Sequence, residues 1–335
     1  MQGGGATGWK PIKAAFFGDV KQRLLDKKSY FSMDKKRRLF IKSGLLGMAG
    51  IMVAPEMVAN VISHSTESIN DKRKTIRKPF FFIQFSDPQF GFTAAMKDNK
   101  LFDTKAEETL MGRSVEIINR LAPPFVIGTG DFWHHKRYDP EMFLYKEYIS
   151  KINKNIKVYH VPGNHDIQSL EKEDIDYYHQ HLGPSSFCFH HENCAFIGLN
   201  SMYFWPERGS NEHERVQYDW LIEQLEAARK CRFKFIFAHI PFFINEYREK
   251  EDYFTIREPM RTKYMETFRR YGVNAVFCGH KHNQFVSKSE DIDVVTCGAV
   301  GLPLGGFHGM NLIKVFPDSY SFEYIALDKF PTRIF

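Results

Sequence analysis

The sequence contains little cysteine and no long apolar run. Among its 335 residues are five cysteines, none in a Cys-x-x-Cys pair, which argues against a disulfide scaffold and against a zinc-finger module. A bridge between Cys188 and Cys194 across a predicted hairpin is geometrically feasible, but buried free thiols are the favoured interpretation. No unbroken apolar stretch of about 18 residues occurs, which argues against a multi-pass membrane protein.

The chain also lacks an even distribution of charge. Residues 1–78 carry 16 Lys and Arg against 6 Asp and Glu, a net charge of +10. Residues 79–335 carry 30 Lys and Arg against 34 Asp and Glu, a net charge of −4. Because the predicted folded body is mildly acidic and its sequence shows no basic stripe, we expect no nucleic-acid partner.

Residues 33–63 resemble a twin-arginine export signal. Residues 37–42 read Arg-Arg-Leu-Phe-Ile-Lys and precede a short apolar stretch, although such signals usually have Ser or Thr before the arginine pair and Leu in place of Ile41. We therefore expect residues 1–32 to be a non-structural upstream segment, 33–63 the signal and 64–78 a linker. The alternative interpretation is a basic amphipathic helix in the cytoplasm.

An export signal predicts both a partner and a location. We expect the twin-arginine export machinery to recognise the segment, and the mature protein to be periplasmic or otherwise extracytoplasmic. The apolar stretch 39–54 contains Lys42 and is short for a transmembrane helix, but an uncleaved signal would still anchor the protein to a membrane.

Strands and helices are predicted to alternate from residue 79 onward. Short apolar runs predict buried strands, and helical spacing of apolar residues predicts helices between them. This order predicts an α/β domain over residues 79–335 with a parallel or mixed sheet. The predicted strands are 80–86, 125–129, 157–161, 186–189, 194–200, 233–238, 275–278, 293–297 and 312–316, and the predicted helices are 104–120, 142–152, 215–229 and 262–271.

Side chains able to bind metal follow five of the predicted strands. In an open α/β sheet, ligands bind at the carboxyl ends of the strands, so these side chains are expected to lie together. Two divalent ions about 3.5–4 Å apart need a shared carboxylate and neutral nitrogen and oxygen donors, and Asp131 is the natural bridge. A mixed N/O donor set suits Mn, Fe, Zn or a similar divalent ion. The side chains are Asp87, Gln89, Asp131, His134, Asn164, His165, Asp166, His239, His280 and His282.

These residues stand in motifs that resemble those of the calcineurin-like metallophosphoesterase superfamily over residues 80–310. The first motif continues through residues 87–91 as Asp-Pro-Gln-Phe-Gly, which is similar to a branch of calcineurin-like phosphoesterase-domain-containing phosphatases. The resemblance implies a four-layer α/β/β/α sandwich with mixed sheets. The motifs, in order, are Asp87-Pro88-Gln89, Gly130-Asp131-x-x-His134, Gly163-Asn164-His165-Asp166, His239 and Gly279-His280-Lys281-His282.

The resemblance also implies a role for each residue. Asp87, Gln89 and His282 would hold a first metal ion. Asn164, His239 and His280 would hold a second, with Asp131 bridging the two. His165 would act as a general acid or as a cation on a phosphate oxygen, and Asp166 would orient it. His134 and Asn200 are the candidate substrate-binding residues, with His134 also expected to support the metal ligands.

The sequence departs from the wider superfamily at Gln89, where His is usual. An amide oxygen is a weaker donor than imidazole, so the first position is expected to bind metal less tightly or to favour harder ions. The leading functional hypothesis is a metal-dependent phosphomonoesterase that uses a metal-bridging hydroxide on a phosphorylated small molecule or a phosphoprotein. The alternatives are a phosphodiesterase or nuclease, and a catalytically silent metal-binding module.

Overall fold

The computed structural model describes residues 78–97, 103–205 and 212–335. The predicted upstream segment, the export signal and all of the linker except Lys78 lie outside these residues. Within the described ranges, no helix is both long and apolar enough to cross a membrane.

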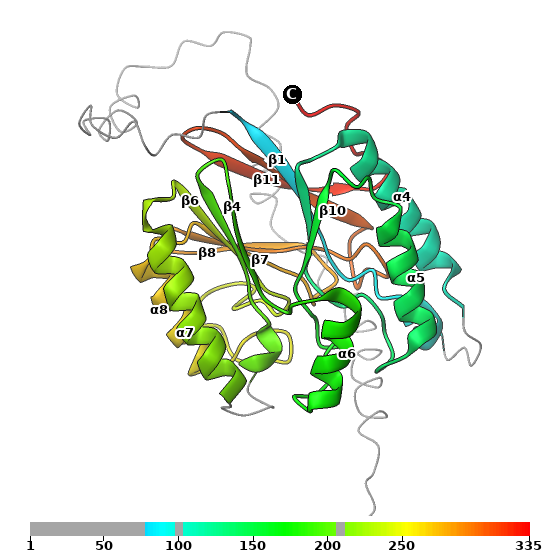
Figure 1. Ribbon diagram of the computed structural model, residues 1–335, viewed down its shortest axis with the longest axis horizontal. Coiled ribbons are helices and arrows are strands. Elements are labelled where there is room, and N and C mark those ends of the chain that lie inside the picture. The colour runs from blue at the N-terminus through cyan, green and yellow to red at the C-terminus, as the bar shows by residue number, and fades with distance from the viewer. Residues whose placement is uncertain (1–77, 98–102, 206–211) are drawn as a thin grey trace, which may run out of the picture. The chain divides into compact units, whose positions relative to one another are not determined.

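In the described part of the chain, eleven strands form two mixed sheets, which Figure 1 shows side by side. In the first sheet the order is β11 (Tyr320–Ala326), β10 (Gly309–Val315), β1 (Phe80–Phe85), β2 (Phe125–Gly128) and β3 (Lys157–His160). In the second it is β4 (Phe187–His191), β5 (Cys194–Gly198), β6 (Phe233–Phe237), β7 (Ala275–Cys278), β9 (Ile292–Thr296) and β8 (Phe285–Ser289). In the first sheet β1, β2 and β3 are parallel to one another, and β10 pairs antiparallel with both β1 and β11. In the second sheet β5, β6, β7 and β9 are parallel, and the edge strands β4 and β8 pair antiparallel with their neighbours.

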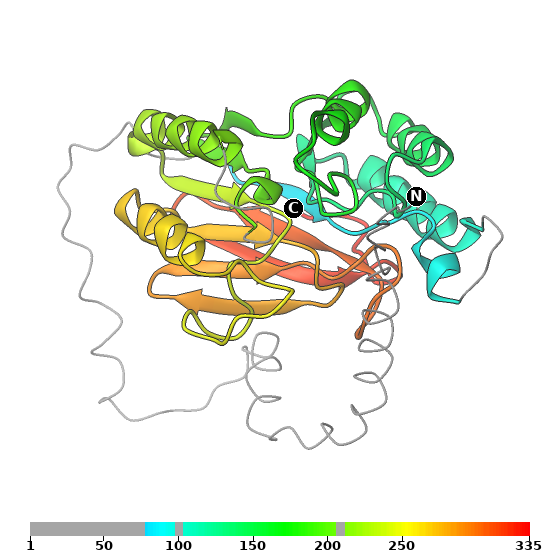
Figure 2. The same ribbon diagram turned by 90° about the horizontal axis from the view of Figure 1, so that it is seen from below.

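Helices cover the outer face of each sheet. Figures 1 and 2 show α4 (Lys105–Leu121) and α5 (Asp139–Ser150) on one side of the paired sheets, and α7 (Glu212–Ala227) and α8 (Met260–Arg270) on the other. The expected α/β/β/α sandwich is therefore confirmed. Shorter elements lie in the connections: α3 (Phe92–Met96), α6 (Lys172–Leu182), and the 3-10 helices η3 (Ser201–Tyr203) and η5 (Ala228–Lys230).

Phenylalanine side chains fill the space between the two sheets. Phe82 on β1 lies 5.4 Å from Phe196 and 6.2 Å from Phe277, ring centroid to ring centroid, and both partners belong to the opposite sheet. Since side chains alternate along a strand, the next residue, Ile83, points to the opposite face of β1. There it belongs to a second apolar cluster, which includes Met111 of α4. Burying each phenylalanine stabilises the fold by about 1.5–3 kcal/mol, and this layer accounts for part of the unusual total of 32 Phe.

The structure confirms every predicted strand and helix to within a few residues, and its described residues add five elements that were not predicted. These are α3, α6, η3, β8 and β11. The predicted hairpin is formed by β4 and β5, in which Cys194 faces His191 and Cys188 faces Ile197. All five cysteines are free, as expected.

Candidate dinuclear metal centre

The loops that follow five parallel strands meet at one edge of the sandwich. Hydrogen bonds tie them together: Asp87 N donates to Gly130 O (3.0 Å), Gln89 N to Asp131 O (2.9 Å), and Gly279 N to His239 O (2.9 Å). The loops follow β1, β2, β3, β6 and β7, so residues from both sheets reach the same place. Parallel strands put their carboxyl ends at one edge, and the sequence order therefore dictates this convergence.

The backbone at these strand ends is unusual. Asp87, Gln89, Asp131, His280 and His282 all have positive φ, between 35° and 68°. Residues other than Gly rarely adopt positive φ, and those that do are concentrated at functional sites.

The candidate ligands form two groups that share one carboxylate. One ligand atom from each of Asp87, Asp131 and His282 lies within 4.8 Å of the other two, and the same is true of Asp131, His239 and His280. Asn164 adds an oxygen to the second group, since its Oδ1 lies 3.2 Å from His239 Nε2. The structure thus brings these predicted ligands together, with Asp131 at the junction.

Main-chain carbonyls fix the orientation of the imidazoles. His239 Nδ1 donates to Thr129 O (2.7 Å), and His282 Nδ1 donates to Leu302 O (2.7 Å). A carbonyl only accepts, so Nδ1 carries the proton and Nε2 is the atom left for a metal. In this structure His239 Nε2 lies 3.2 Å from Asp131 Oδ2, and His282 Nε2 lies 3.2 Å from Asp87 Oδ1.

Two buried polar atoms mark where ions would sit. Gln89 Oε1 and His280 Nε2 are both shielded from solvent and have no hydrogen-bond partner. Leaving such atoms unsatisfied costs about 1–3 kcal/mol each, and a bound cation would satisfy both. With two carboxylates, two amide oxygens and three imidazoles, the donor set fits two divalent ions of the Mn, Fe or Zn type.

The electrostatics of the metal-free site follow from the same contacts. Burial opposes ionisation of Asp131, but charge on His239 and His165 outweighs it and holds the pKa of Asp131 well below its usual range. Burial likewise lowers the pKa of His239, yet the Asp131 carboxylate raises it overall to about 9. The pKa of His282 is raised by Asp87 in the same way. For His280, burial and charge on His239 hold the pKa well below the ordinary value.

The structure corrects the role expected for Asp166. Its carboxylate is buried and accepts hydrogen bonds from the backbone N–H groups of Asp131 (2.7 Å), Phe132 (2.8 Å) and Gly163 (2.8 Å). Those bonds hold the loop that carries Asp131. The group that orients His165 is instead the carbonyl of His134, which accepts from His165 Nδ1 at 2.7 Å.

His165 and His134 form a stacked pair beside the ligands. Their ring centroids lie 4.6 Å apart at an interplanar angle of 24°, and the backbone N–H of His165 donates to Asp131 Oδ1 (2.8 Å). His165 is half-buried, and its Nε2 is the ring nitrogen that the carbonyl leaves open. His134 Nδ1 accepts from Gln89 Nε2 at 3.3 Å, which fixes the amide of Gln89. Burial and charge on His165 lower the pKa of His134 to about 2, so His134 is a neutral acceptor.

Asn200 does not lie where a substrate would touch it. Its side chain is fully buried, and its Oδ1 accepts from Met202 N (3.0 Å), which caps η3. Its backbone N–H and carbonyl both pair with the side chain of Gln217. The expectation that Asn200 binds substrate is therefore corrected: it closes the end of β5.

Sequence reasoning missed Glu141, which holds the loop of the stacked histidines. This fully buried carboxylate at the start of α5 accepts from His134 N (3.0 Å) and His135 N (2.8 Å). It also lies 2.7 Å from His135 Nδ1. A glutamate in the first turn of a helix gives no sequence signal for such a role, because the partners are backbone amides.

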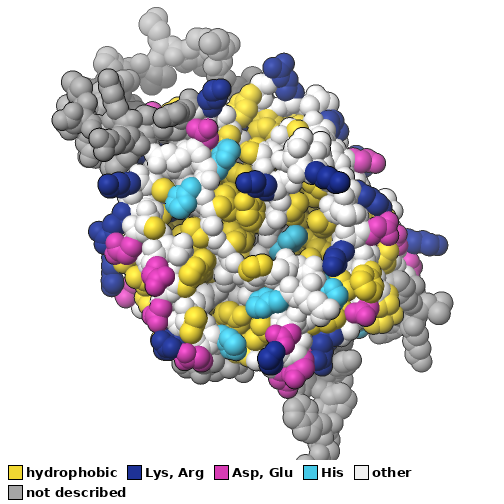
Figure 3. Space-filling model, in the orientation of Figure 1, with side chains coloured by type: hydrophobic (Ala, Val, Ile, Leu, Met, Phe, Trp, Pro, Cys, Tyr) yellow, Lys and Arg dark blue, Asp and Glu magenta, His cyan; other side chains and the backbone are white. Residues whose placement is uncertain are grey.

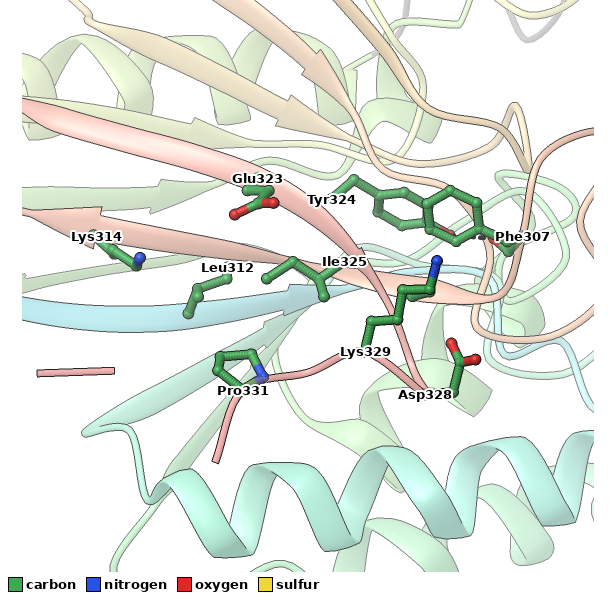
Figure 4. Close-up of a pocket in the computed structure, with 10 residues that line it drawn as sticks. Phe307, Leu312, Lys314, Glu323, Tyr324, Ile325, Asp328, Lys329 and Pro331 are labelled. Carbon is green, nitrogen blue, oxygen red and sulfur yellow. Dashed lines mark hydrogen bonds between the residues drawn. The ribbon is translucent and has the colours of Figure 1, made fainter. Parts of the chain in front are cut away.

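A separate hollow of about 580 Å³ lies on the outer face of β10 and β11 (Figure 4). Phe307 and Tyr324 stack at one end of it with ring centroids 5.0 Å apart. None of the candidate metal ligands lines this hollow.

Comparisons with known proteins agree with this geometry. The model of the calcineurin-like phosphoesterase family matches residues 82–284. The serine/threonine-protein phosphatase CPPED1 of Rattus norvegicus is 30% identical over 278 residues, covering 79% of this chain and 89% of the relative. Its Homo sapiens counterpart is 30% identical over 274 residues, covering 77% and 87%. A dimetal phosphatase from Danio rerio has a similar fold, with a TM-score of 0.54 and 16% identity over 74% of this chain and 96% of that one. The chain is a phosphoric ester hydrolase and belongs to the calcineurin-like phosphoesterase family.

Proposed function

We propose that this protein is a two-metal phosphomonoesterase whose substrates include phosphoproteins. One observation carries the proposal: the Asp131 carboxylate belongs to both groups of candidate ligands, as a bridge between two ions requires. The relatives named as serine/threonine-protein phosphatases support a phosphoserine or phosphothreonine substrate. The proposed ligands are Asp87, Gln89, His282 and Asp131 for one ion, and Asn164, His239, His280 and Asp131 for the other.

Each residue of the centre has a task in this reaction. When bound, divalent ions of the Mn, Fe or Zn type supply the positive charge that activates water and neutralises phosphate oxygens. His165, held at Nδ1 by the His134 carbonyl, presents Nε2 to the oxygen of the leaving group and gives it a proton. Asp166 keeps the Asp131 loop in place through three backbone N–H groups.

Substrate class is tested with small esters first. The manganese-loaded protein is expected to hydrolyse para-nitrophenyl phosphate faster than its bis-ester and to release phosphate from a phosphoserine peptide. Faster cleavage of the bis-ester would favour a phosphodiesterase, and no hydrolysis of any ester by fully loaded protein would favour a silent metal-binding module. On the face drawn in Figure 3, Lys and Arg are interspersed with Asp and Glu, an arrangement that does not favour a long nucleic acid.

His165→Asn tests the proton donor. We expect this variant to keep its metal but to lose about 10²–10⁴-fold in turnover on an alkyl phosphate, the usual contribution of a positioned acid. The loss should shrink on para-nitrophenyl phosphate, whose leaving group scarcely needs a proton. Metal content by mass spectrometry and turnover on both esters are the measurements, with the exposed His190 of β4, changed to Asn, as the matched control. Full activity of His165→Asn on the alkyl ester would show that the donor is another group.

We further propose that the protein is exported by the twin-arginine route. The support is the pair Arg37 and Arg38 before a short apolar stretch, together with the net charge of +10 on residues 1–78. Replacing both arginines by Lys is expected to leave the protein in the cytoplasm, and cell fractionation measures this. Replacing Lys35 and Lys36 by Arg is the matched control, which should not change the location. Unchanged export of the variant in which Lys replaces Arg37 and Arg38 would contradict the proposal.

A further inference from the structure

Three aromatic side chains surround the ring of His280. Tyr253 lies 5.3 Å from it, Phe254 5.4 Å and Trp205 6.0 Å, centroid to centroid. Tyr253 and Phe254 stand almost perpendicular to one another, at 87°, and Tyr253 also packs against Trp205 at 5.2 Å. We call Tyr253 and Phe254 the aromatic wall. It borders the second group of candidate ligands.

The aromatic wall remains accessible although its neighbours are buried. His280 is 4% exposed and Trp205 2%, whereas Tyr253 and Phe254 are only half-buried. The Lys281 ammonium lies 3.5 Å over the Phe254 ring, which holds that ring from one side. Half-exposed aromatic rings next to a cluster of polar ligands are typical of the apolar side of a small-molecule site.

Arg261 locks the segment that carries the wall. This arginine is 1% exposed and stands in the first turn of α8. Its guanidinium donates to Ile256 O (2.8 Å), Glu249 O (2.9 Å), Tyr247 O (3.1 Å) and Thr255 Oγ1 (3.2 Å). The planar guanidinium has five N–H donors and can bind several loop carbonyls at once, which the more compact lysine ammonium cannot do.

We propose that Tyr253 and Phe254 contact the part of the substrate next to the phosphate, that they favour phosphomonoesters with a flat apolar group at that place, and that Arg261 is their positioning residue. This inference rests on the proposed phosphomonoesterase function. With metal bound, the candidate ligands and His165 would hold the phosphate, so the remainder of the ester would lie against the side chains that border the centre. On the side of His280 that border is aromatic.

The size of the effect follows from the strength of aromatic contacts. A ring packed against a ring contributes modestly beyond its buried area, and this converts to a preference of about 3–10-fold for a larger flat leaving group. The preference is expected chiefly in KM, because the contact is the same in the ground state and the transition state.

The experiment compares 1-naphthyl phosphate with phenyl phosphate, whose leaving groups are of similar acidity but differ in aromatic area. The ratio of their kcat/KM values is measured for the metal-loaded wild type, Phe254→Leu, Tyr253→Leu and Arg261→Lys. We expect each variant to lower the ratio about 3–10-fold, with unchanged metal content and unchanged inhibition by inorganic phosphate. Phe143→Leu, at an exposed position of α5, and Arg270→Lys, at an exposed position of α8, are the matched controls and should keep the wild-type ratio.

A binding measurement keeps this test separate from the proposed function. Calorimetry is expected to show that the wild type binds naphthylmethylphosphonate more tightly than methylphosphonate. Phe254→Leu should lose this difference in affinity. If neither ester is hydrolysed but the naphthyl compound binds more tightly, the proposed function is wrong and the proposed role of the aromatic wall is supported. If the ratio of kcat/KM values is the same in the wild type, Phe254→Leu and Tyr253→Leu, the proposed role of the aromatic wall is wrong. Should Arg261→Lys fail to fold, the two wall variants decide the question.

Discussion

The two groups of candidate ligands share Asp131 but differ in charge. The first group contains a second carboxylate, Asp87, together with one imidazole and the amide of Gln89. The second group has no carboxylate besides Asp131 and contains two imidazoles, His239 and His280, with the amide of Asn164. Both groups are buried to a similar degree, so the contrast lies in the donor atoms.

This contrast explains how the chain tolerates glutamine in place of the usual histidine. Two carboxylates give the first position more negative charge than the second, which offsets the weaker donor at Gln89 and favours a harder ion there. The amide is also well oriented, because its Nε2 donates to His134 and leaves Oε1 buried and unpartnered. The two positions are therefore expected to differ in metal preference while depending equally on Asp131.

The largest effect should come from removing the shared carboxylate. Asp131→Asn leaves two cations facing each other without a bridge, so we expect both equivalents of metal to be lost. Because bound ions stabilise the transition state by several kcal/mol, losing them should lower turnover by about 10³-fold or more. Mass spectrometry measures the metal content, and para-nitrophenyl phosphate the turnover.

Asp293→Asn is the matched control for this change. Asp293 is a carboxylate on β9 that accepts from Tyr320 away from the centre. It should retain two equivalents of metal and near-normal turnover. Retention of one tightly held ion by Asp131→Asn would show that the groups are independent and that Asp131 is not shared.

A smaller and more selective effect should come from the amides. Gln89→Ala is expected to weaken only one of the two metal equivalents, by about 10-fold or more, and Asn164→Ala only the other. Titration of the metal-free protein with manganese in the presence of a competing chelator resolves the two. Asn283→Ala, an amide next to His282 that caps Gln284 N, is the control and should leave both equivalents unchanged. Equal weakening of both equivalents by either amide variant would remove the distinction between the groups.

Side-chain chemistry made most of this centre predictable from the sequence. Carboxylates, amides and imidazoles after successive strands indicated the ligands, and the parallel order implied that they would meet. Backbone partners left no such signal. The carbonyls of Thr129, Leu302 and His134 orient three imidazoles, yet any residue supplies a carbonyl. The role of Asp166 was missed for the same reason, since its partners are backbone N–H groups.

Two of the elements that escaped prediction, α6 and β8, have narrow apolar faces. Helix α6 buries only Asp174, Ile175 and Tyr178 among its 11 residues, and one of these is charged. Edge strand β8 alternates exposed and buried residues, but its buried positions include Ser287 and Ser289, so apolar alternation is absent. Buried central strands such as β6, with five consecutive buried residues, gave a clear pattern.

The smallest effect concerns protons, and it compares the two groups before metal binds. In the metal-free protein, Asp131 raises the pKa of His239 to about 9 against the opposing effect of burial, and Asp87 likewise raises the pKa of His282. The second group, through His239, thus holds a proton at neutral pH, which stabilises the metal-free fold fully below about pH 6.5 and less as pH rises through about 9; the raised pKa of His282 acts in the same direction in the first group.

A metal ion must displace these protons, so affinity should increase with pH. We expect the equivalent held by His239 to bind up to about tenfold more tightly per pH unit between about pH 7 and 9, with release of about one proton, and the equivalent held by His282 to respond in the same direction. Calorimetry in two buffers of different ionisation enthalpy counts the protons, and repeating it with Gln89→Ala and Asn164→Ala assigns each proton to its group. His280 should contribute none, because burial and charge on His239 keep its pKa low and leave it neutral. Metal affinity that is constant across this range would mean that neither imidazole is protonated in the metal-free protein. The carboxylates would then be the only charged ligands of the centre.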